Sequence, residues 1–342
     1  MTTNSYLCLP SAMALVAILA MVVPAISQEA DDTLSTVLDA ADELESLRTI
    51  VVAHVGEILA DRGYDDYSTS TPTNIKSASK VIVTTMIGIA IEQGLLESAD
   101  QPIATLLADD LPDDPPPQLD EVTLSHLMSM QAGLRATSGA NYGAWVTSPN
   151  WVRAALAQPF TDAPGGDMIY STGSTHLLSA ILTEVGGQST LALAREWFAP
   201  IEGFSISAWE RDPQGIYLGG NEMAMSPLSL LAFGEMIRNG GVTAEGERIV
   251  PQAWIEQSWE QRTTSRFGGH GYGYGWFLAN IGGFDTRYAW GYGGQMLYIV
   301  PDLDLTVVMT SDPTNPSGGN GYRDRLHDLL ADIIAAVETE TP

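Results

Sequence analysis

The sequence predicts an α/β fold of the α+β kind, in which both ends of the chain build one layer and the middle forms a helical insertion. Strand-like runs occur near the N-terminus, at residues 49–53 and 57–60, and near the C-terminus, at 296–300 and 305–310. Helical patterns fill most of the region between them. The economical arrangement is one sheet made from the two termini and covered by helices.

Composition places the chain among ordinary globular proteins with an unusual charge. Its 342 residues are 45% hydrophobic, enough for a sizeable core. Acidic residues outnumber basic ones by 42 to 15, which gives a formal net charge of −27. A field of that sign repels nucleic acids and anionic membranes, so neither is an expected partner. A solvated acidic surface, suited to a salty habitat, explains the charge more simply than recruitment of a cationic substrate.

The N-terminal segment predicts a signal peptide. Residues 1–27 carry no charged side chain, contain the apolar run 12–23, and end in an Ala-Ile-Ser sequence that suits signal peptidase. The run is short for a membrane span, so a retained anchor is the second interpretation. The only cysteine, Cys8, lies in this segment, which leaves a mature chain without disulfides or thiols. We therefore expect a secreted or periplasmic protein with one domain over residues 28–342.

The first part of that domain, about residues 33–72, predicts a helix, a hairpin and a linker. Apolar residues at helical spacing predict an amphipathic helix over 33–46. Val55 and Gly56 separate the two early strands, as in a hairpin. A polar linker then leads into the run 81–91, which is so apolar that we expect a fully buried helix.

The middle of the chain, about residues 73–264, predicts helices joined by long loops. An acidic, proline-rich loop at 109–117 reads as solvated surface, and a loop at 133–151 is rich in Gly, Ser and aromatic residues. His126 and His176 lie in apolar helical runs and read as packed histidines with satisfied hydrogen bonds. Further helical patterns occupy residues 122–128, 175–185, 190–198 and 227–238.

The C-terminal part, about residues 265–340, completes the layer that the N-terminal part begins. Glycines and aromatic residues alternate over 271–276, which indicates strand and turn packing. The two late strands follow. An apolar stripe over 326–337 predicts a closing amphipathic helix.

A serine and a lysine stand at the start of the buried helix. Ser77 and Lys80 are three residues apart, so on a helix they share a face and can touch. A serine hydroxyl needs such a base to become a nucleophile at neutral pH. Serine at a helix start is more often an N-cap, and the spacing arises often by chance, so the pair alone is a weak signal. Lys76, the only other lysine, is expected to face solvent or a local carboxylate.

Three motifs in this order resemble those of the serine β-lactamase and penicillin-recognising superfamily: Ser77-Ala78-Ser79-Lys80, Tyr170-Ser171-Thr172, and Gly291-Tyr292-Gly293-Gly294-Gln295. The closer likeness is to the class C-related hydrolases and esterases, including the 6-aminohexanoate-dimer hydrolase type, and it extends over about residues 47–337. The resemblance implies a β-lactamase-like fold, with an antiparallel sheet flanked by helices and an inserted helical region. It is a poor guide to the substrate.

The resemblance also implies a serine hydrolase that works through an acyl-enzyme. Ser77 would attack a carbonyl, Lys80 would accept the proton, and Tyr170 would return it to the leaving group. The backbone N–H groups of Ser77 and Tyr292 would hold the oxyanion. Neither a metal nor a cofactor is expected. Weaker candidates for substrate contacts are Trp145, Thr172, Gly291 and Gln295.

Two departures from the class C pattern narrow the expected substrate. Thr172 replaces the asparagine of the second motif, and no lysine precedes Gly291, where Trp290 stands instead. That lysine helps to hold the carboxylate of β-lactams, so its absence favours an esterase or amidase for a less anionic small molecule. Arg287 could replace it, although an exposed surface arginine is the simpler interpretation. A β-lactamase, a D-Ala-D-Ala carboxypeptidase and a non-catalytic binding or sensor protein stay open as alternatives.

Overall fold

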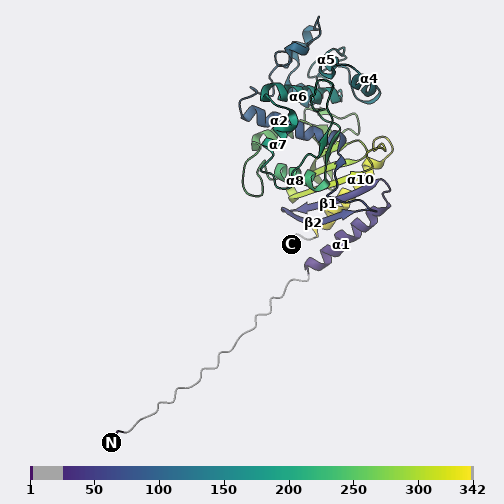
Figure 1. Ribbon diagram of the computed structural model, residues 1–342. Helices are drawn as coiled ribbons and strands as arrows, with labels where there is room; N and C mark the ends of the chain where they lie inside the picture. Colours follow the sequence, from purple (N-terminus) through teal and green to yellow (C-terminus); the bar gives the residue numbers. More distant parts are fainter. Residues whose placement is uncertain (3–25, 340–342) are drawn as a thin grey trace.

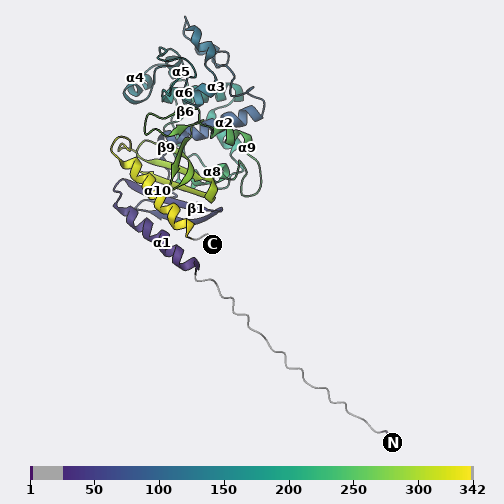
Figure 2. The same ribbon diagram turned by 180° about the vertical axis from the view of Figure 1, so that it is seen from behind.

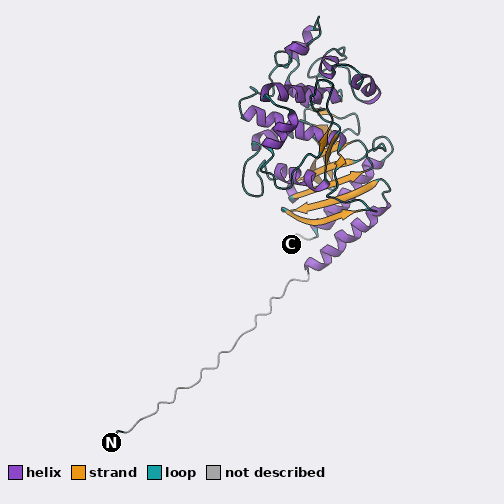
Figure 3. Ribbon diagram, in the orientation of Figure 1, coloured by secondary structure: helices purple, strands orange, loops and turns teal. Residues whose placement is uncertain are grey.

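The computed structural model describes residues 1–2 and 26–339. The predicted signal peptide lies almost wholly outside these residues and stays a prediction. The described chain has a layer of strands with two helices against it at one end and a mainly helical region at the other (Figures 1 and 3).

One antiparallel sheet organises the strand layer, with the order β2-β1-β11-β10-β9-β8-β7-β6. The N-terminal strand β1 pairs with the C-terminal strand β11, as the sequence predicts for a layer built from both chain ends. The fold is thus the expected β-lactamase-like one. The strands are β1 Leu47–His54, β2 Glu57–Gly63, β6 Thr263–Thr264, β7 Gly271–Tyr272, β8 Phe277–Ile281, β9 Phe284–Gly291, β10 Gln295–Val300 and β11 Leu305–Ser311.

Strand β10 shows how the sheet separates two cores. Met296, Tyr298 and Val300 belong to the cluster under the terminal helices, whereas Leu297 and Ile299 belong to the cluster under the helical region. Successive side chains on a strand point to opposite faces. Because both faces are covered, the strand is buried throughout and is apolar from Met296 to Val300, without alternating polar residues.

Helices α1 (Ile26–Ala40) and α10 (Tyr322–Glu338) lie side by side over one face of the sheet (Figure 2). Leu34 of α1 and Leu330 of α10 are buried in the same core cluster. The amphipathic stripe of α10 was predicted. Helix α1 begins earlier than predicted. It also ends earlier, because the chain passes into a 3-10 turn at Ala41–Glu43 before β1.

The opposite face of the sheet is covered by the helical region, whose helix α8 packs directly on β1, β10 and β11. These helices include all the helical patterns expected for the middle of the chain. They are α2 Lys80–Glu92, α3 Leu124–Met128, α4 Tyr142–Val146, α5 Trp151–Leu156, α6 Thr172–Gly186, α7 Thr190–Trp197, α8 Pro227–Arg238 and α9 Gln252–Ser258.

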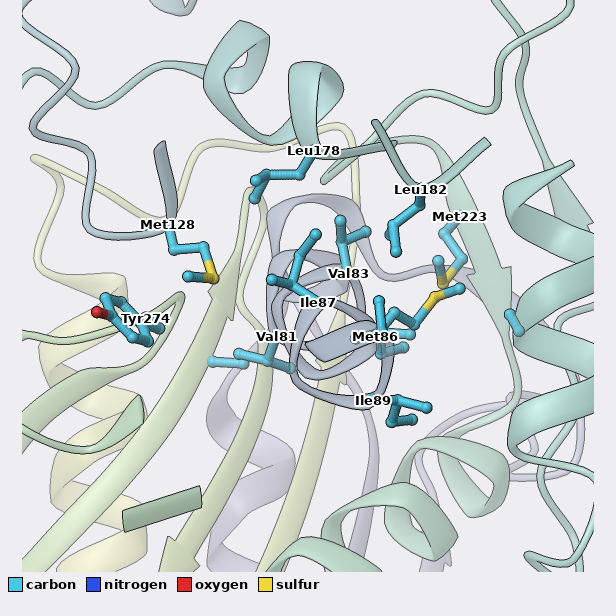
Figure 4. Close-up of a cluster of buried hydrophobic side chains, with 14 of the residues drawn as sticks. Val81, Val83, Met86, Ile87, Ile89, Met128, Leu178, Leu182, Met223 and Tyr274 are labelled. Atoms are coloured by element: carbon cyan, nitrogen blue, oxygen red, sulfur yellow. The ribbon is translucent and has the colours of Figure 1, made fainter. Parts of the chain in front are cut away.

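Helix α2 is the centre of the helical region. Its residues from Lys80 to Ala90 are all buried, so the apolar run has no solvent face. Figure 4 shows Val81, Val83 and Met86 pointing in different directions into surrounding apolar side chains. A helix that is apolar all round must be buried, which is what the sequence predicts for this run.

A second, small sheet lies within the helical region and was not predicted. Its strands are β3 (Thr73–Asn74), β5 (Met223–Met225) and β4 (Ala208–Trp209), in the order β3-β5-β4. Strands of two or three residues are too short to show a period of two in the sequence. This sheet joins the segment before Ser77 to a loop almost 150 residues later in the chain, with a separation of 148 between Asn74 and Glu222.

Within residues 26–339, no single helix is long and apolar enough to cross a membrane. Helices α6 and α7 pass the length and composition test only as a bent pair. Most of the apolar residues of both helices are buried in the core beside α2.

Candidate active site

Ser77 and Lys80 meet at the entrance to helix α2. The chain forms a short 3-10 turn, Lys76–Ser79, and continues directly into the α-helix at Lys80. The Nζ of Lys80 lies 3.1 Å from the Oγ of Ser77. The predicted contact is therefore present, although Ser77 stands in the 3-10 turn and not in the first turn of the α-helix itself.

Lys80 is buried with no compensating carboxylate among the ion pairs of the described residues. Its Nζ also lies 2.6 Å from the carbonyl oxygen of Gly220, which accepts its second hydrogen bond. Burial penalises the charged form and lowers the pKa of Lys80 to about 7. A substantial share of the amine is thus neutral near pH 7, and a neutral amine can accept a proton.

Tyr170 stands beside this pair, just before helix α6. Both Tyr170 and Ser77 line the same cavity, and the Nζ of Lys80 lies 5.1 Å from the centre of the Tyr170 ring. Burial raises the pKa of Tyr170 to about 12, against the opposing effect of the Ser77 side chain. Tyr170 therefore keeps its proton at neutral pH. Hydroxyl, amine and phenol form one cluster, in which Lys80 is buried whereas Ser77 and Tyr170 are half-buried.

Strand β9 passes close to the segment before Ser77. A Cβ on Gly291 would lie 2.2 Å from the carbonyl oxygen of Ile75, so only glycine permits this approach. The next residue, Tyr292, begins the turn between β9 and β10. It is 50% exposed and lines the same cavity as Ser77. The motif around Gly291 thus serves to bring the end of β9 to the serine.

A cavity of about 760 Å³ opens at Ser77 and is large enough for a small organic molecule. Aromatic side chains supply much of its wall, and a Gly- and Ser-rich loop before α10 supplies another part. Its lining residues include Ser138, Tyr170, Arg266, Phe267, Trp290 and Tyr292.

Four of these wall residues were missed as site residues. Arg266 and Phe267 lie in a loop between β6 and β7, and Ser138 lies before a 3-10 turn, so no motif marks them. The sequence drew attention to Trp290 only because it stands before Gly291, where class C enzymes have a lysine. Its Nε1 donates a hydrogen bond of 3.0 Å to the Oγ of Ser317, which fixes the ring against the loop.

Arg323 is a further missed residue of the cavity wall, but its side chain is fully engaged. The guanidinium lies 5.0 Å from the centre of the Trp290 ring. It donates to the carboxylate of Asp324, at 2.8 Å, and to the carbonyl oxygen of Phe267. Arg323 therefore ties the Phe267 loop to the first turn of α10. A sequence gives no sign of such a contact between residues 56 positions apart.

The weaker candidates for substrate contacts fall outside the cavity lining. Trp145 is buried against Trp151 and donates its Nε1 to the carbonyl oxygen of that residue at 2.9 Å. Gln295 is fully buried and exchanges hydrogen bonds with the backbone of Ser311, so it joins two neighbouring strands. Thr172 is the nearest to the cavity, since its Oγ1 lies 3.0 Å from the Oγ of the lining residue Ser138.

Arg287 also lies away from the cavity. Its guanidinium lies 5.7 Å from the centre of the Trp259 ring and 3.9 Å from the carboxylate of Asp285. The expectation of an exposed surface residue is wrong in one respect: the side chain is only 21% exposed. The guanidinium group itself lies over the tryptophan ring.

The two histidines in apolar runs are packed and hydrogen-bonded, as expected. His126 accepts a hydrogen bond from the backbone N–H of Thr123 and closes the N-terminal cap of α3. His176 is fully buried, with its Nε2 at 3.1 Å from the carboxylate of Asp212. Neither lines the Ser77 cavity. In the described part of the chain, no group of three or more metal-ligating side chains was found.

Fold and site together define a serine hydrolase. The chain belongs to the Beta-lactamase family, whose model matches residues 48–332. The resemblance stated from the three motifs is thereby confirmed.

Solved structures with the same fold carry several different activities in their names. A protein assigned as 6-aminohexanoate-dimer hydrolase from Bacillus anthracis is 20% identical, with a TM-score of 0.72 over 89% of this chain and 83% of that one. EstCE1, a hydrolase with promiscuous acyltransferase activity, is 19% identical, with a TM-score of 0.71 over 92% and 100%. A class C β-lactamase from Rhodobacter sphaeroides is 17% identical, with a TM-score of 0.66 over 90% and 99%.

At such identities, these similarities show the fold alone. Among curated proteins, none matches this chain. The choice among ester, amide and β-lactam substrates therefore depends on the residues of this cavity.

Proposed function

We propose that this protein hydrolyses a small ester or amide through an acyl-enzyme on Ser77. The observation that carries the proposal is the contact of 3.1 Å between the Oγ of Ser77 and the Nζ of Lys80, an amine whose pKa burial lowers to about 7. A buried neutral amine in hydrogen-bond contact with a serine is the arrangement that makes a weak hydroxyl nucleophilic.

The proposed reaction has two halves. In the first, the Oγ of Ser77 attacks the substrate carbonyl while Lys80 takes its proton. Tyr170 then gives its own proton to the departing alcohol or amine and receives the proton held by Lys80. In the second, water attacks the acyl-enzyme with the same groups acting in reverse. The backbone N–H groups of Ser77 and Tyr292 stabilise the oxyanion in both halves. The residues that line the cavity surround the bound substrate. The proposed reaction uses no cofactor.

The cavity walls favour an acyl or leaving group with apolar surface. Phe267, Trp290 and Tyr292 present aromatic rings to the space in front of Ser77, and such rings bury apolar ligand surface well. Trp290 takes the region where related β-lactamases have a lysine, and Arg323 is already engaged with Asp324 and Phe267. A strongly anionic substrate would thus depend on Arg266, an exposed arginine of the cavity wall, and not on a lysine in the third motif.

A serine-directed fluorophosphonate and a p-nitrophenyl ester test the proposal on wild type and Ser77→Ala. The wild type is expected to label and to release p-nitrophenol, and Ser77→Ala to do neither above background. A wild type that neither labels nor turns over would support the alternative of a non-catalytic binding or sensor protein.

The β-lactamase alternative draws on the family itself and on the β-lactamases among the similar structures. Nitrocefin hydrolysis separates it from the proposed activity. We expect nitrocefin to be cleaved more slowly than the ester. Faster cleavage of nitrocefin would reverse the assignment and show that Trp290 is compatible with a β-lactam carboxylate.

The predicted signal peptide supports a secreted or periplasmic location, which remains a proposal. Mass spectrometry of the protein exported from a bacterial host would test it. A mature N-terminus at residue 28 is expected, and retention of residues 1–27 on the membrane would favour the anchor interpretation.

A further inference from the structure

The residue directly before the proposed nucleophile has an unusual backbone. Lys76 has a φ of +50°, in the left-handed region that L-residues rarely adopt. Non-glycine residues in this region persist only where surrounding contacts hold them, and they concentrate at functional sites. The conformation of Lys76 sets the direction in which the chain enters Ser77.

Asn74 and Glu222 hold Lys76 in place. The backbone N–H of Lys76 donates to the Oδ1 of Asn74 at 2.9 Å, and its Nζ lies 3.0 Å from the Oε1 of Glu222. The Nδ2 of Asn74 donates to the other carboxylate oxygen of Glu222. The carboxylate of Glu222 thus accepts hydrogen bonds from the side chains of both Asn74 and Lys76, which precede Ser77.

Glu222 also ends the loop that carries the acceptor of Lys80. Gly220, two residues earlier, accepts the hydrogen bond from the Nζ of Lys80 at 2.6 Å. A Cβ on Gly220 would lie 2.6 Å from the Cγ and 3.0 Å from the Nζ of Lys80, so the loop packs directly against this side chain. Glu222 itself has a φ of +50°. Its position is therefore linked to that of the Gly220 carbonyl.

We propose that Lys76 and Glu222 are positioning residues of the reaction. Their ion pair connects the backbone that aims Ser77 to the loop that holds Lys80, so the nucleophile and its base keep a fixed relation. The inference rests on the proposed function, because it assigns a purpose to the geometry of Ser77 and Lys80. It concerns residues that do not line the cavity.

Exposure distinguishes this role from a merely stabilising one. The side chains of Lys76 and Glu222 are 20% and 26% exposed. Ion pairs that are partly open to water contribute little to stability. If the pair were purely structural, its removal would thus change both stability and turnover only slightly. A positioning pair affects turnover much more than stability, since small misplacements of reacting groups slow a reaction strongly.

The experiment compares Lys76→Met, Glu222→Gln and the double variant with wild type, using ester turnover per site titrated by fluorophosphonate. Each single variant is expected to lose between about 10- and 100-fold in kcat, with KM within about twofold and a melting temperature close to that of wild type. Because both act through one pair, the double variant should lose no more than the worse single variant.

Two matched variants complete the design. Lys76→Arg keeps the ion pair and should restore kcat to within about threefold of wild type. Glu235→Gln removes a carboxylate from another pair, 2.9 Å from Arg238 on α8, and should leave kcat unchanged. Titration with the probe counts only correctly folded sites, so a variant that folds poorly still gives a valid kcat.

Single variants with kcat within about twofold of wild type would overturn the inference, and so would losses that simply add in the double variant. In both cases the wild type would still label and turn over, and the proposed function would stand. A wild type without labelling or turnover would instead overturn the proposed function and this inference together.

Discussion

The Nζ of Lys80 lies 3.1 Å from the Oγ of Ser77, and no carboxylate among the described ion pairs meets it. Lys76, the only other lysine of the chain, lies half-buried at 3.0 Å from the carboxylate of Glu222. Two lysines four residues apart thus have opposite environments. One keeps a counter-ion, and the other is placed where its charge is unfavourable.

Replacement of Lys80 should abolish most of the activity. Lys80→Met keeps the length of the side chain but removes the proton acceptor, so we expect kcat/KM to fall by at least about 10³-fold. Ester hydrolysis per correctly folded protein is the measurement, with circular dichroism to confirm folding. Retention of more than about a tenth of wild-type activity would show that another group acts as the base.

Activity should rise with pH around neutrality. The pKa of Lys80 is lowered to about 7, and only its neutral form accepts a proton. The free-enzyme profile of kcat/KM should therefore increase through a midpoint near pH 7 and then level off. Since burial raises the pKa of Tyr170 to about 12, no fall in kcat/KM is expected until well above pH 10. A bell-shaped profile centred below pH 6 would contradict the assignment.

The same shift predicts how stability depends on pH. The pKa of Lys80 is about 7 in the folded chain, against an ordinary value of 10.5. Between these two values the unfolded chain binds the proton and the folded chain does not, so stability rises with pH. We compare the free energy of unfolding of wild type with that of Lys80→Met. The difference, wild type minus variant, should increase by up to about 1.4 kcal/mol per pH unit between these two pKa values. Urea unfolding at pH 7.5 and 9.5 measures it, and a difference that is flat or falls with pH would refute the burial of a neutral amine.

Gly291 should tolerate no side chain. Gly291→Ala places a Cβ 2.2 Å from the carbonyl oxygen of Ile75, which must push β9 away from the serine. We expect a loss of about 1–3 kcal/mol in stability and a fall in turnover. Gly143→Ala is the matched control: it lies in helix α4 with open space around its Cβ, so stability should stay the same or improve. Equal effects of the two substitutions would remove the close approach of β9 as an explanation.

Much of the fold could be predicted because its signals are local. The apolar run of α2, the stripe of α10 and the two strand-rich ends each show in a window of a dozen residues. The small sheet of β3, β5 and β4 left no such signal, because its strands have two or three residues each. Its pairing is decided by contacts between distant segments.

The site divides in the same way. The sequence by itself determined that Ser77 and Lys80 touch, because residues three apart meet on any helical turn, and the motif order marked Tyr170 and Gly291. The tertiary structure alone decided that the Gly220 carbonyl meets Lys80, that Phe267 and Trp290 form the cavity wall, and that Trp145 and Gln295 are packed elsewhere. The period of a helix depends on residues that are near one another in the sequence. These contacts, in contrast, join distant segments that meet only when the strands of the sheet pair and the core packs around α2.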